Sequence, residues 1–413
     1  MSKTNFTTAA LAALATAFGL AAGSDAAHAQ HTTSWTGTVG EDRDAESGGR
    51  FKMRGRFQWD VMSPEWDTLA ESGTRSYVRR AFLGVQGRLS EEWRYKIDFI
   101  LSPGDDAAGQ VGVDDAFLEY VHDDWSIVIG EHNITSPLED RISSLDVPFI
   151  ERSSVINAFE YGRRAGLGFI TGGANWHFSA AAQGDSVNNA ESGANNDEST
   201  ALSGRFTFAP IFESSPDGVT LVHLGVHARQ RYQGDDAVSQ IRTRPLNGRN
   251  TRWIDSGSVA ANRLESDISL GGEVAVNFGP FSAQAEYITL EGETAAGLER
   301  EFSGYYVDAY WSITGESRNY RGNQGSFGAI VPRNPITREG FGHLGLSARY
   351  EYIDLSDGTD VNRGEQTAYA VGLDWIPLDH VRFKLNYAIS DMDRTVGADD
   401  EAQIITLRSQ FDF

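Results

Sequence analysis

The sequence predicts an all-β fold, a transmembrane antiparallel β-barrel of about 16 strands. Three observations lead to this prediction: an N-terminal stretch typical of export signals, a repeated alternation of apolar and polar residues, and a last strand that ends at Phe413. Strands of a membrane barrel alternate in this way because one face of each strand contacts lipid while the other faces the lumen.

Residues 1–29 have the features of a cleaved export signal. Lys3 supplies a positive charge near the start, residues 9–22 are apolar, and Ala27-His28-Ala29 has the small-x-small form of a cleavage sequence. We therefore expect residues 30–50 to form a short periplasmic segment and residues 51–413 to form the barrel. An N-terminal helix packed in a core is the alternative.

The composition excludes several classes of protein. The chain has 413 residues and no cysteine, so disulfides, zinc–thiolate sites and a cysteine nucleophile are excluded. Its net charge of -23 disfavours nucleic-acid binding. We find no P-loop, zinc-protease or nucleophile-elbow motif, and His223 and His227 share a strand face without further ligands that could complete a metal site. We expect no enzyme activity, no cofactor and no metal.

The strand prediction rests on a period of two residues. From Phe51 to Trp59, aromatic and other apolar residues fall on one face, and Lys52, Arg54 and Arg56 fall on the other. An even number of such strands returns both ends of the barrel to the periplasmic side. The sixteen segments begin near Phe51, Arg75, Trp93, Val111, Trp125, Arg163, Asn175, Ala201, Val219, Ser266, Phe281, Glu301, Gly342, Gln366, His380 and Gln403.

The links between the segments alternate in length, as short periplasmic turns and longer extracellular loops do in such barrels. The expected long loops are residues 60–74, 133–162, 185–200, 234–265 and 354–365. The loop at 133–162 carries apolar residues, so we expect it to fold inward and narrow the barrel. A surface lid or a latch to another subunit is the alternative for this loop.

One link breaks the alternation. Residues 316–341 are long, yet the strand count puts them on the periplasmic side. Either a strand has been miscounted or this turn folds up into the lumen. An inward turn would bring Arg318, Arg321, Arg333 and Arg338 to the constriction, together with Arg141 and Arg152 of the loop at 133–162.

The faces expected to line the lumen are rich in cations. A confined passage lined by one sign of charge concentrates counter-ions, and guanidinium groups suit phosphate and carboxylate. If these cations are instead paired with the acids Asp98, Asp115, Glu119, Glu273, Glu286 and Glu351, the pore would be only weakly selective. The expected pore-lining cations are Lys52, Arg54, Arg56, Arg80, Arg88, Arg94, Lys96, Arg164, Arg205, Arg229, Arg231, Arg349, Arg382, Lys384 and Arg408.

Three stretches of the chain resemble the phosphate-selective porin O/P family. They are residues 79–99, which begin RRAFLGV; residues 130–153, which begin GEH and end FIERS; and residues 314–355, which begin TGESRNY and end RYEYIDL. The resemblance covers residues 51–413 and implies a sixteen-stranded, homotrimeric porin of the bacterial outer membrane. It also implies inward segments, including a long periplasmic turn.

The resemblance implies passive diffusion of small anions such as phosphate, with outer-membrane lipid and lipopolysaccharide around the barrel. The sequence departs from the lysine-rich pattern of the best-known members, because Lys52, Lys96 and Lys384 are the only lysines after the export signal. A weakly selective porin for sugars or other nutrients is the alternative, with Tyr306 and Tyr310 on one strand face as stacking groups. An outer-membrane enzyme or adhesin is a third possibility, but it lacks motif support.

Overall fold

The computed structural model describes residues 51–69, 72–102, 111–188, 199–216, 218–233, 239–246, 249–257, 260–358 and 362–413. The expected export signal and the segment at 30–50 lie outside the described residues. Within the described ranges, no helix is long and apolar enough to cross a membrane.

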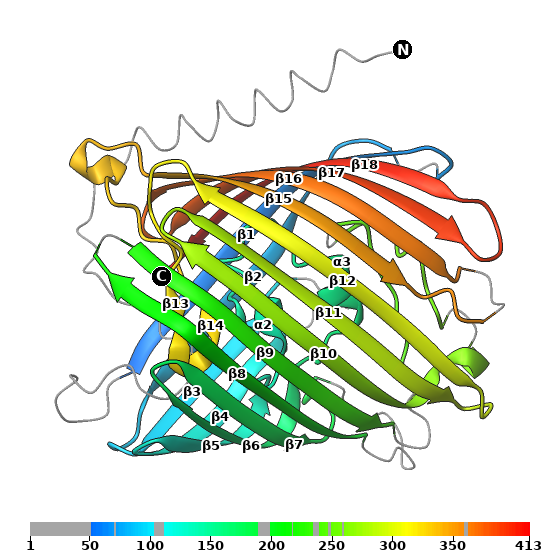
Figure 1. Cartoon of the computed structure of the whole chain (residues 1–413), viewed down its shortest axis with the longest axis horizontal. Helices are drawn as coiled ribbons and strands as arrows, with labels where there is room; N and C mark the ends of the chain where they lie inside the picture. The colour runs from blue at the N-terminus through cyan, green and yellow to red at the C-terminus, as the bar shows by residue number, and fades with distance from the viewer. Residues whose placement is uncertain are drawn as a thin grey trace.

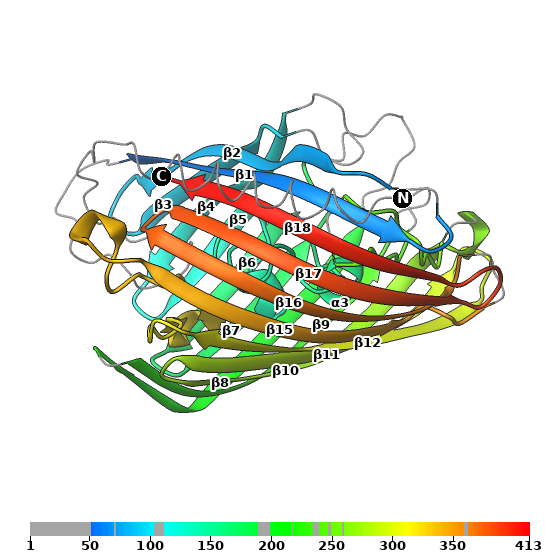
Figure 2. The same cartoon turned by 90° about the horizontal axis from the view of Figure 1, so that it is seen from above.

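Sixteen antiparallel strands close into one barrel, in which β1 pairs with both β2 and β18 (Figures 1 and 2). This confirms the predicted fold class. The barrel strands are β1 (Phe51–Trp66), β2 (Arg75–Arg88), β3 (Trp93–Ile100), β4 (Gly112–His122), β5 (Trp125–His132), β6 (Arg164–Gly173), β7 (Trp176–Gln183), β8 (Thr200–Ser215), β9 (Gly218–Tyr232), β10 (Leu264–Phe278), β11 (Phe281–Thr294), β12 (Glu299–Ser312), β15 (His343–Asp354), β16 (Gly364–Leu378), β17 (Val381–Arg394) and β18 (Asp400–Asp412).

The strands begin within three residues of the predicted positions, but the end of β1 was predicted wrongly. The sequence analysis started a loop at Asp60, whereas β1 continues to Trp66. The alternation fails there because Val61 and Met62 are both apolar and Pro64 follows. Pairing with β18, which sets Pro64 opposite Ile404, extends the strand regardless of this local pattern.

The inner faces of several strands are polar near one end of the barrel and apolar near the other. The apolar end faces a core built from both wall and loop residues, among them Ile288 and Leu290 of β11 and Phe302 of β12. Val155 and Phe159 from the loop after β5 belong to the same core. Burial of these side chains draws that loop into the barrel. Part of the lumen is therefore filled by a packed core.

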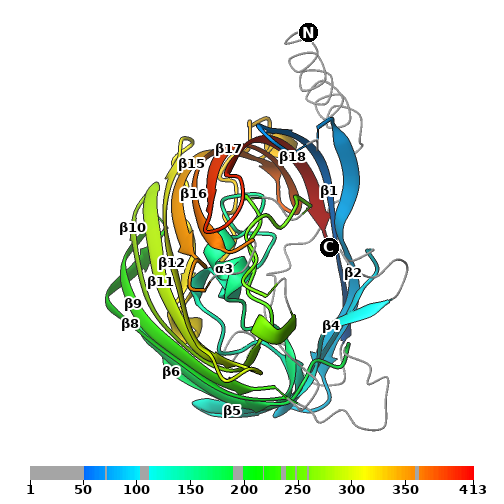
Figure 3. The ribbon, with the colours of Figure 1, turned by 90° about the vertical axis from the view of Figure 1, so that its right-hand side faces the viewer.

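Two segments lie inside the barrel. We call residues 133–163 loop 3; it contains α2 (Leu138–Arg141) and α3 (Ser154–Ala158), and α3 lies within the ring of strands in Figure 3. We call residues 313–342 the long turn; it contains β13 (Tyr320–Arg321), η2 (Gly322–Gln324), β14 (Ser326–Phe327) and η3 (Ile336–Arg338). Residues 233–263, loop 5, contain η1 (Ala260–Asn262) and share the end of the barrel at which loop 3 begins.

Candidate functional site

Loop 3 is held to the wall first through its backbone N–H groups. The Glu286 carboxylate on β11 accepts hydrogen bonds from the N–H groups of Leu138 (2.9 Å) and Glu139 (2.8 Å) at the start of α2. Glu351 on β15 accepts one from the N–H of Ser154 at the start of α3 (3.0 Å). The first N–H groups of a helix have no partner within the helix, so a carboxylate placed there both satisfies and positions them.

Wall cations hold the carbonyl groups of the same loop. Arg382 donates to the carbonyl of Leu145, and Lys384 donates to those of Val147 and Phe149. Arg382 also lies 3.1 Å from the Asp374 carboxylate. Both cations are buried, so these two predicted pore-lining residues lie beneath loop 3.

Glu151 of loop 3 binds three arginines of the barrel wall. Its carboxylate accepts from Arg79 (2.8 Å), Arg80 (3.2 Å) and Arg408 (2.7 Å). Burial opposes ionisation, but the three guanidinium groups outweigh it and hold the pKa of Glu151 well below the usual value of 4.5. Arg408 also pairs with Asp60 at 2.7 Å. The cluster therefore fixes loop 3 against β1, β2 and β18.

A β-bulge explains how two consecutive arginines reach the same carboxylate. Arg80 pairs with Gln58 and Val78 pairs with Trp59, so Arg79 is an extra residue on β2. At a bulge the strict alternation of sides is lost. The period-two reading placed only Arg80 in the lumen and missed Arg79, although the pair itself was part of the family resemblance.

Arg349 on β15 joins the wall to two separate points of loop 3. It pairs with Asp308 at 2.7 Å, donates to the carboxylate of Glu139, and donates to the carbonyl of Glu151 at 3.2 Å. Its guanidinium lies 4.4 Å from the ring centroid of Phe149. This predicted pore-lining residue is therefore covered and acts as a structural anchor.

The long turn is held in the lumen by a similar set of contacts. Arg205 on β8 pairs with Glu273 at 2.8 Å and donates to the carbonyls of Gln324 (3.2 Å) and Gly325 (2.6 Å). The Tyr320 hydroxyl lies 2.6 Å from Nδ1 of His223 on β9. Of the two alternatives for this link, an inward turn is therefore confirmed.

The arginines of the long turn fall into different environments. Arg318 is buried, stacks 3.8 Å from the centroid of Phe327, and has its pKa lowered to about 10 by burial. Arg321 is half-buried. Arg333 and Arg338 are exposed on the stretch that contains η3, which projects from the end of the barrel in Figures 1 and 2. The structure does not bring these last two together with the other arginines expected at the constriction.

The predicted lumen cations therefore form two groups. The buried group lies under loop 3, the long turn or neighbouring side chains, and the half-buried group comes from β1, β2, β6 and loop 3, with Arg321 from the long turn. The buried residues are Arg94, Lys96, Arg205, Arg229, Arg231, Arg318, Arg349, Arg382, Lys384 and Arg408. The half-buried residues are Lys52, Arg54, Arg56, Arg80, Arg88, Arg141, Arg152, Arg164 and Arg321.

Most ion pairs in the half-buried region have the guanidinium more exposed than the carboxylate. The arginine side chains there are 14–31% exposed, whereas the carboxylates that they contact are 2–9% exposed. Arg164 and Asp185 show the reverse order, at 12% and 26%. The pairs with the guanidinium outermost are Arg54–Asp98, Arg79–Glu151, Arg80–Glu151, Arg152–Asp140, Arg163–Asp114 and Arg163–Asp115.

Arg141 is a weakly bound member of this region. Its Nη1 donates to the carbonyl of Asn133 at 3.4 Å, and its buried Nε has no hydrogen-bond partner. Burial, together with the positive charge of Arg205, lowers its pKa to about 10, so the side chain stays cationic at neutral pH. A guanidinium with unpaired donors can bind an oxyanion without first losing another partner.

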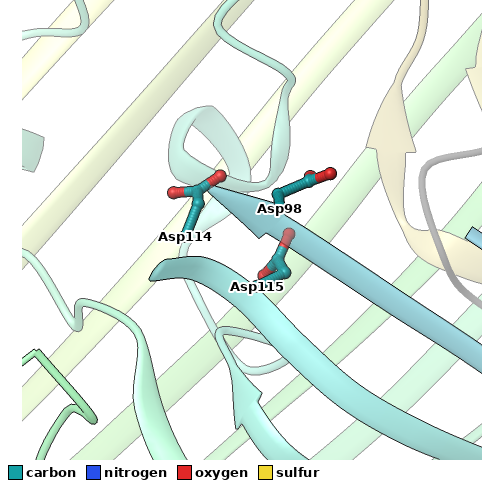
Figure 4. Close-up of side chains that lie close together, drawn as sticks. All are labelled: Asp98, Asp114 and Asp115. Carbon is teal, nitrogen blue, oxygen red and sulfur yellow. The ribbon is translucent and has the colours of Figure 1, made fainter. Parts of the chain in front are cut away.

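Three aspartates gather where β3 meets β4. Figure 4 shows Asp98 of β3 with Asp114 and Asp115 of β4, whose nearest oxygens all lie within 4.8 Å of one another. A bulge on β4 sends both consecutive aspartates inward. Lys96 contacts Asp98 and Asp115, and Arg163 contacts Asp114 (3.2 Å) and Asp115 (2.9 Å). The cluster is already balanced by cations, which leaves little attraction for a metal ion.

Loop 5 contributes cations that the sequence analysis missed. Arg242, Arg244, Arg249 and Arg252 are half-buried, and the guanidinium of Arg249 lies 5.3 Å from the ring centroid of Tyr77. Four arginines within eleven residues of an acidic chain are a signal that could have identified them.

The aromatic pair considered for sugar stacking is covered. Tyr306 and Tyr310 are buried, and their hydroxyl groups bind Glu286 (2.6 Å) and His343 (2.7 Å). Their rings are therefore engaged in the wall and do not line an open passage.

A closed sixteen-stranded barrel with an apolar outer surface and a polar lumen narrowed by an inward loop defines an outer-membrane porin. It is a channel and not an enzyme, and its place is the bacterial outer membrane. A family model described as "Phosphate-selective porin O and P" matches residues 51–413, and the chain belongs to this family. In such barrels the longer loops are extracellular and the short turns periplasmic, which sets loops 3 and 5 on the extracellular side.

Two relatives cover most of the chain. An uncharacterised protein of Caulobacter vibrioides is 31% identical over 385 residues, which are 89% of this chain and 75% of that protein. Porin O of Pseudomonas aeruginosa is 24% identical over 407 residues, which are 88% of each chain.

Solved structures share the fold at low sequence identity. OprB of Pseudomonas putida has a TM-score of 0.57 at 7% identity, with 88% of this chain and 94% of that chain covered. The anion-selective porin of Comamonas acidovorans has a TM-score of 0.54 at 10% identity, covering 88% and 100%. OmpT of Vibrio cholerae, in its trimer form, has a TM-score of 0.52 at 11% identity, covering 88% and 100%.

Proposed function

We propose that this porin allows passive diffusion of small anions, with a preference for oxyanions such as phosphate. The observation that carries the proposal is the orientation of the ion pairs on the β1–β6 side. A solute in the passage meets guanidinium groups first, with the carboxylates behind them. Exposed guanidinium donors bind phosphate and carboxylate well, even when each arginine also has a carboxylate behind it.

Three cations supply the expected contacts at the constriction. Arg141 has donors to spare, Arg56 donates to the Ser144 hydroxyl (2.9 Å), and Arg163 is 31% exposed. Arg79, Arg80 and Arg152 add charge along loop 3 and β2. The name of the matching family agrees with this proposal, and the Comamonas acidovorans porin that shares the fold is described as anion-selective.

Ion selectivity in a planar bilayer tests the proposal. In a KCl gradient, an anion-preferring pore gives a reversal potential of the sign set by chloride, and addition of phosphate should reduce the chloride current. A reversal potential with the sign set by potassium would overturn the proposal.

Replacing Arg163 by glutamine should weaken the anion preference. Asp114 and Asp115 would lose their outer partner and face the passage. A unit charge about 5 Å from a solute in a water-like dielectric contributes about 0.8 kcal/mol, so the permeability ratio should change about fourfold. Arg338→Gln is the matched control, because it makes the same charge change on the exposed η3 stretch. An unchanged permeability ratio in Arg163→Gln would mean that this cluster does not line the path of the ions.

The same proposal includes a homotrimer. Strands β3, β5 and β7 have 8 residues each. At about 3.3 Å per residue and a tilt of about 45°, they span about 19 Å, less than the apolar band of about 25 Å on such barrels. Because these strands are too short to span the apolar layer, we expect another protein subunit, and not lipid, to cover this part of the barrel. Mass measurement of the detergent-purified porin should give three chains, and a mass of one chain would contradict this part of the proposal.

A further inference from the structure

The outer surface of the barrel has a shallow apolar groove over β8–β12. Its volume is about 730 Å³. Leu224 and Val226 of β9, Val274 of β10, and Tyr287 and Tyr305 of β11 and β12 line it. Gly272 lies in its floor, and a Cβ built on this glycine meets no atom within 4 Å. The missing side chain thus leaves a notch of the width that a hydrocarbon chain can occupy.

A polar pocket of about 640 Å³ continues the groove toward the extracellular end of the same strands. Glu291 of β11 lies opposite Glu301 of β12, and Glu293 lies opposite Glu299. All four side chains point outward and are exposed. Like charges directly across a strand pair are destabilising, so the pocket favours a ligand that brings positive charge.

The other charged groups of the pocket do not neutralise it. Asp357 adds a fifth carboxylate. Arg231 is engaged with Asp267 at 2.5 Å, which leaves Arg300 as the guanidinium able to offset the five acids among the described lining residues. Arg300 itself donates to the carbonyl of Glu299. The pocket therefore keeps a strong negative charge at the level of the outer-leaflet headgroups.

The length of the strands indicates that lipid, and not a second copy of the chain, covers this surface. β8–β12 have 14–16 residues each. With a tilt of about 45° they span about 33 Å or more, enough to cross the apolar band and reach the headgroups. Tyr287 and Tyr305 pair across β11 and β12 and line the groove near the middle of these strands.

We propose that the groove and the acidic pocket together bind one molecule of lipopolysaccharide. One acyl chain lies in the groove over Gly272, and the anionic headgroup is joined to Glu291 and Glu301 through a divalent cation. Carboxylate oxygens are the ligands that Ca²⁺ and Mg²⁺ prefer, and a bridging cation satisfies both the protein acids and the anionic headgroup. This proposal does not depend on the solute that the pore conducts.

The test measures lipopolysaccharide bound per chain, by native mass spectrometry of the full-length porin incubated with purified lipopolysaccharide and Ca²⁺. Two variants address the two parts of the site: Glu291→Gln with Glu301→Gln for the headgroup, and Gly272→Leu for the acyl chain. Each should lower binding at least about fivefold, the effect of losing about one ionic contact or its apolar equivalent. Chelation of Ca²⁺ should lower binding to the parent similarly, and should change the double glutamine variant no further.

A matched control removes another outward acid pair. Asp391 of β17 lies opposite Glu401 of β18, and Asp391→Asn with Glu401→Gln should leave binding at the parental level. An equal loss of lipopolysaccharide binding in this control would mean that the acidic residues around the rim act together, without a specific site on β11 and β12. Binding that resists chelation would exclude the cation bridge and overturn the proposal, as would normal binding by Gly272→Leu. Heat-dependent migration in detergent gels verifies that each variant forms the barrel.

Discussion

Glu151→Gln is expected to release loop 3 from the wall and to raise the single-channel conductance. The carboxylate neutralises Arg79, Arg80 and Arg408, which would otherwise repel one another within a small volume. Removing one member of a buried ion-pair cluster typically costs about 3–5 kcal/mol because the remaining charges stay buried without compensation. Loop 3 has other anchors, so we expect larger and noisier conductance and not loss of the barrel.

The matched control for this variant is Glu160→Gln. Glu160 is an exposed carboxylate of the same loop, and its replacement changes the charge of the lumen by the same amount. Its contact with Arg229 uses the backbone carbonyl, which the substitution leaves in place. If Glu160→Gln raises the conductance as much as Glu151→Gln, charge and not anchoring explains the effect.

The depressed pKa of Glu151 adds a test by pH. A carboxylate whose folded pKa lies below its unfolded value contributes stability that is present above the unfolded value and is lost as the pH falls through the folded pKa. Since the pKa of Glu151 is held well below 4.5, its hold on loop 3 should persist from neutral pH down to about pH 4.5. Conductance of the parent porin that rises on acidification between about pH 7 and pH 5 would contradict this role.

The alternation of residues predicted the strands well because it depends on the two environments of each strand. It located all sixteen, and it placed Lys52, Arg54 and Arg56 on the inner face. It did not predict which inner-face positions are apolar, such as Ile288 and Leu290, whose inner neighbours are loop residues. These positions contact distant parts of the chain, so the local alternation of residues cannot predict them.

Burial of the lumen cations depends on the same long-range contacts. Arg205 and Arg54 look alike in the sequence, yet the long turn covers Arg205 while Arg54 stays partly exposed. The sequence analysis was only partly right about the acids that pair with these cations. Glu273 and Asp98 pair with arginines, whereas Glu286 and Glu351 bind the backbone of loop 3. Loops that return into a barrel decide which charges remain available to a solute.

Arg205→Met is expected to free the tip of the long turn. The substitution removes the donors to the carbonyls of Gln324 and Gly325, and it leaves the carboxylate of Glu273 buried without its guanidinium partner. With an expected local cost of about 3 kcal/mol, amide exchange in residues 318–328 should accelerate about a hundredfold. Hydrogen–deuterium exchange of the purified porin, followed by mass spectrometry, measures this change directly.

Two further variants separate the contributions of Arg205. Arg164→Met removes a cation that binds the carbonyl of Gly184 and the hydroxyl of Ser199, so exchange in residues 318–328 should match that of the parent. Adding Glu273→Gln to Arg205→Met removes the uncompensated buried charge and should restore part of the protection. The protection still missing then measures the two carbonyl hydrogen bonds. Parental exchange in Arg205→Met would mean that Tyr320 and the other contacts hold the long turn without this arginine.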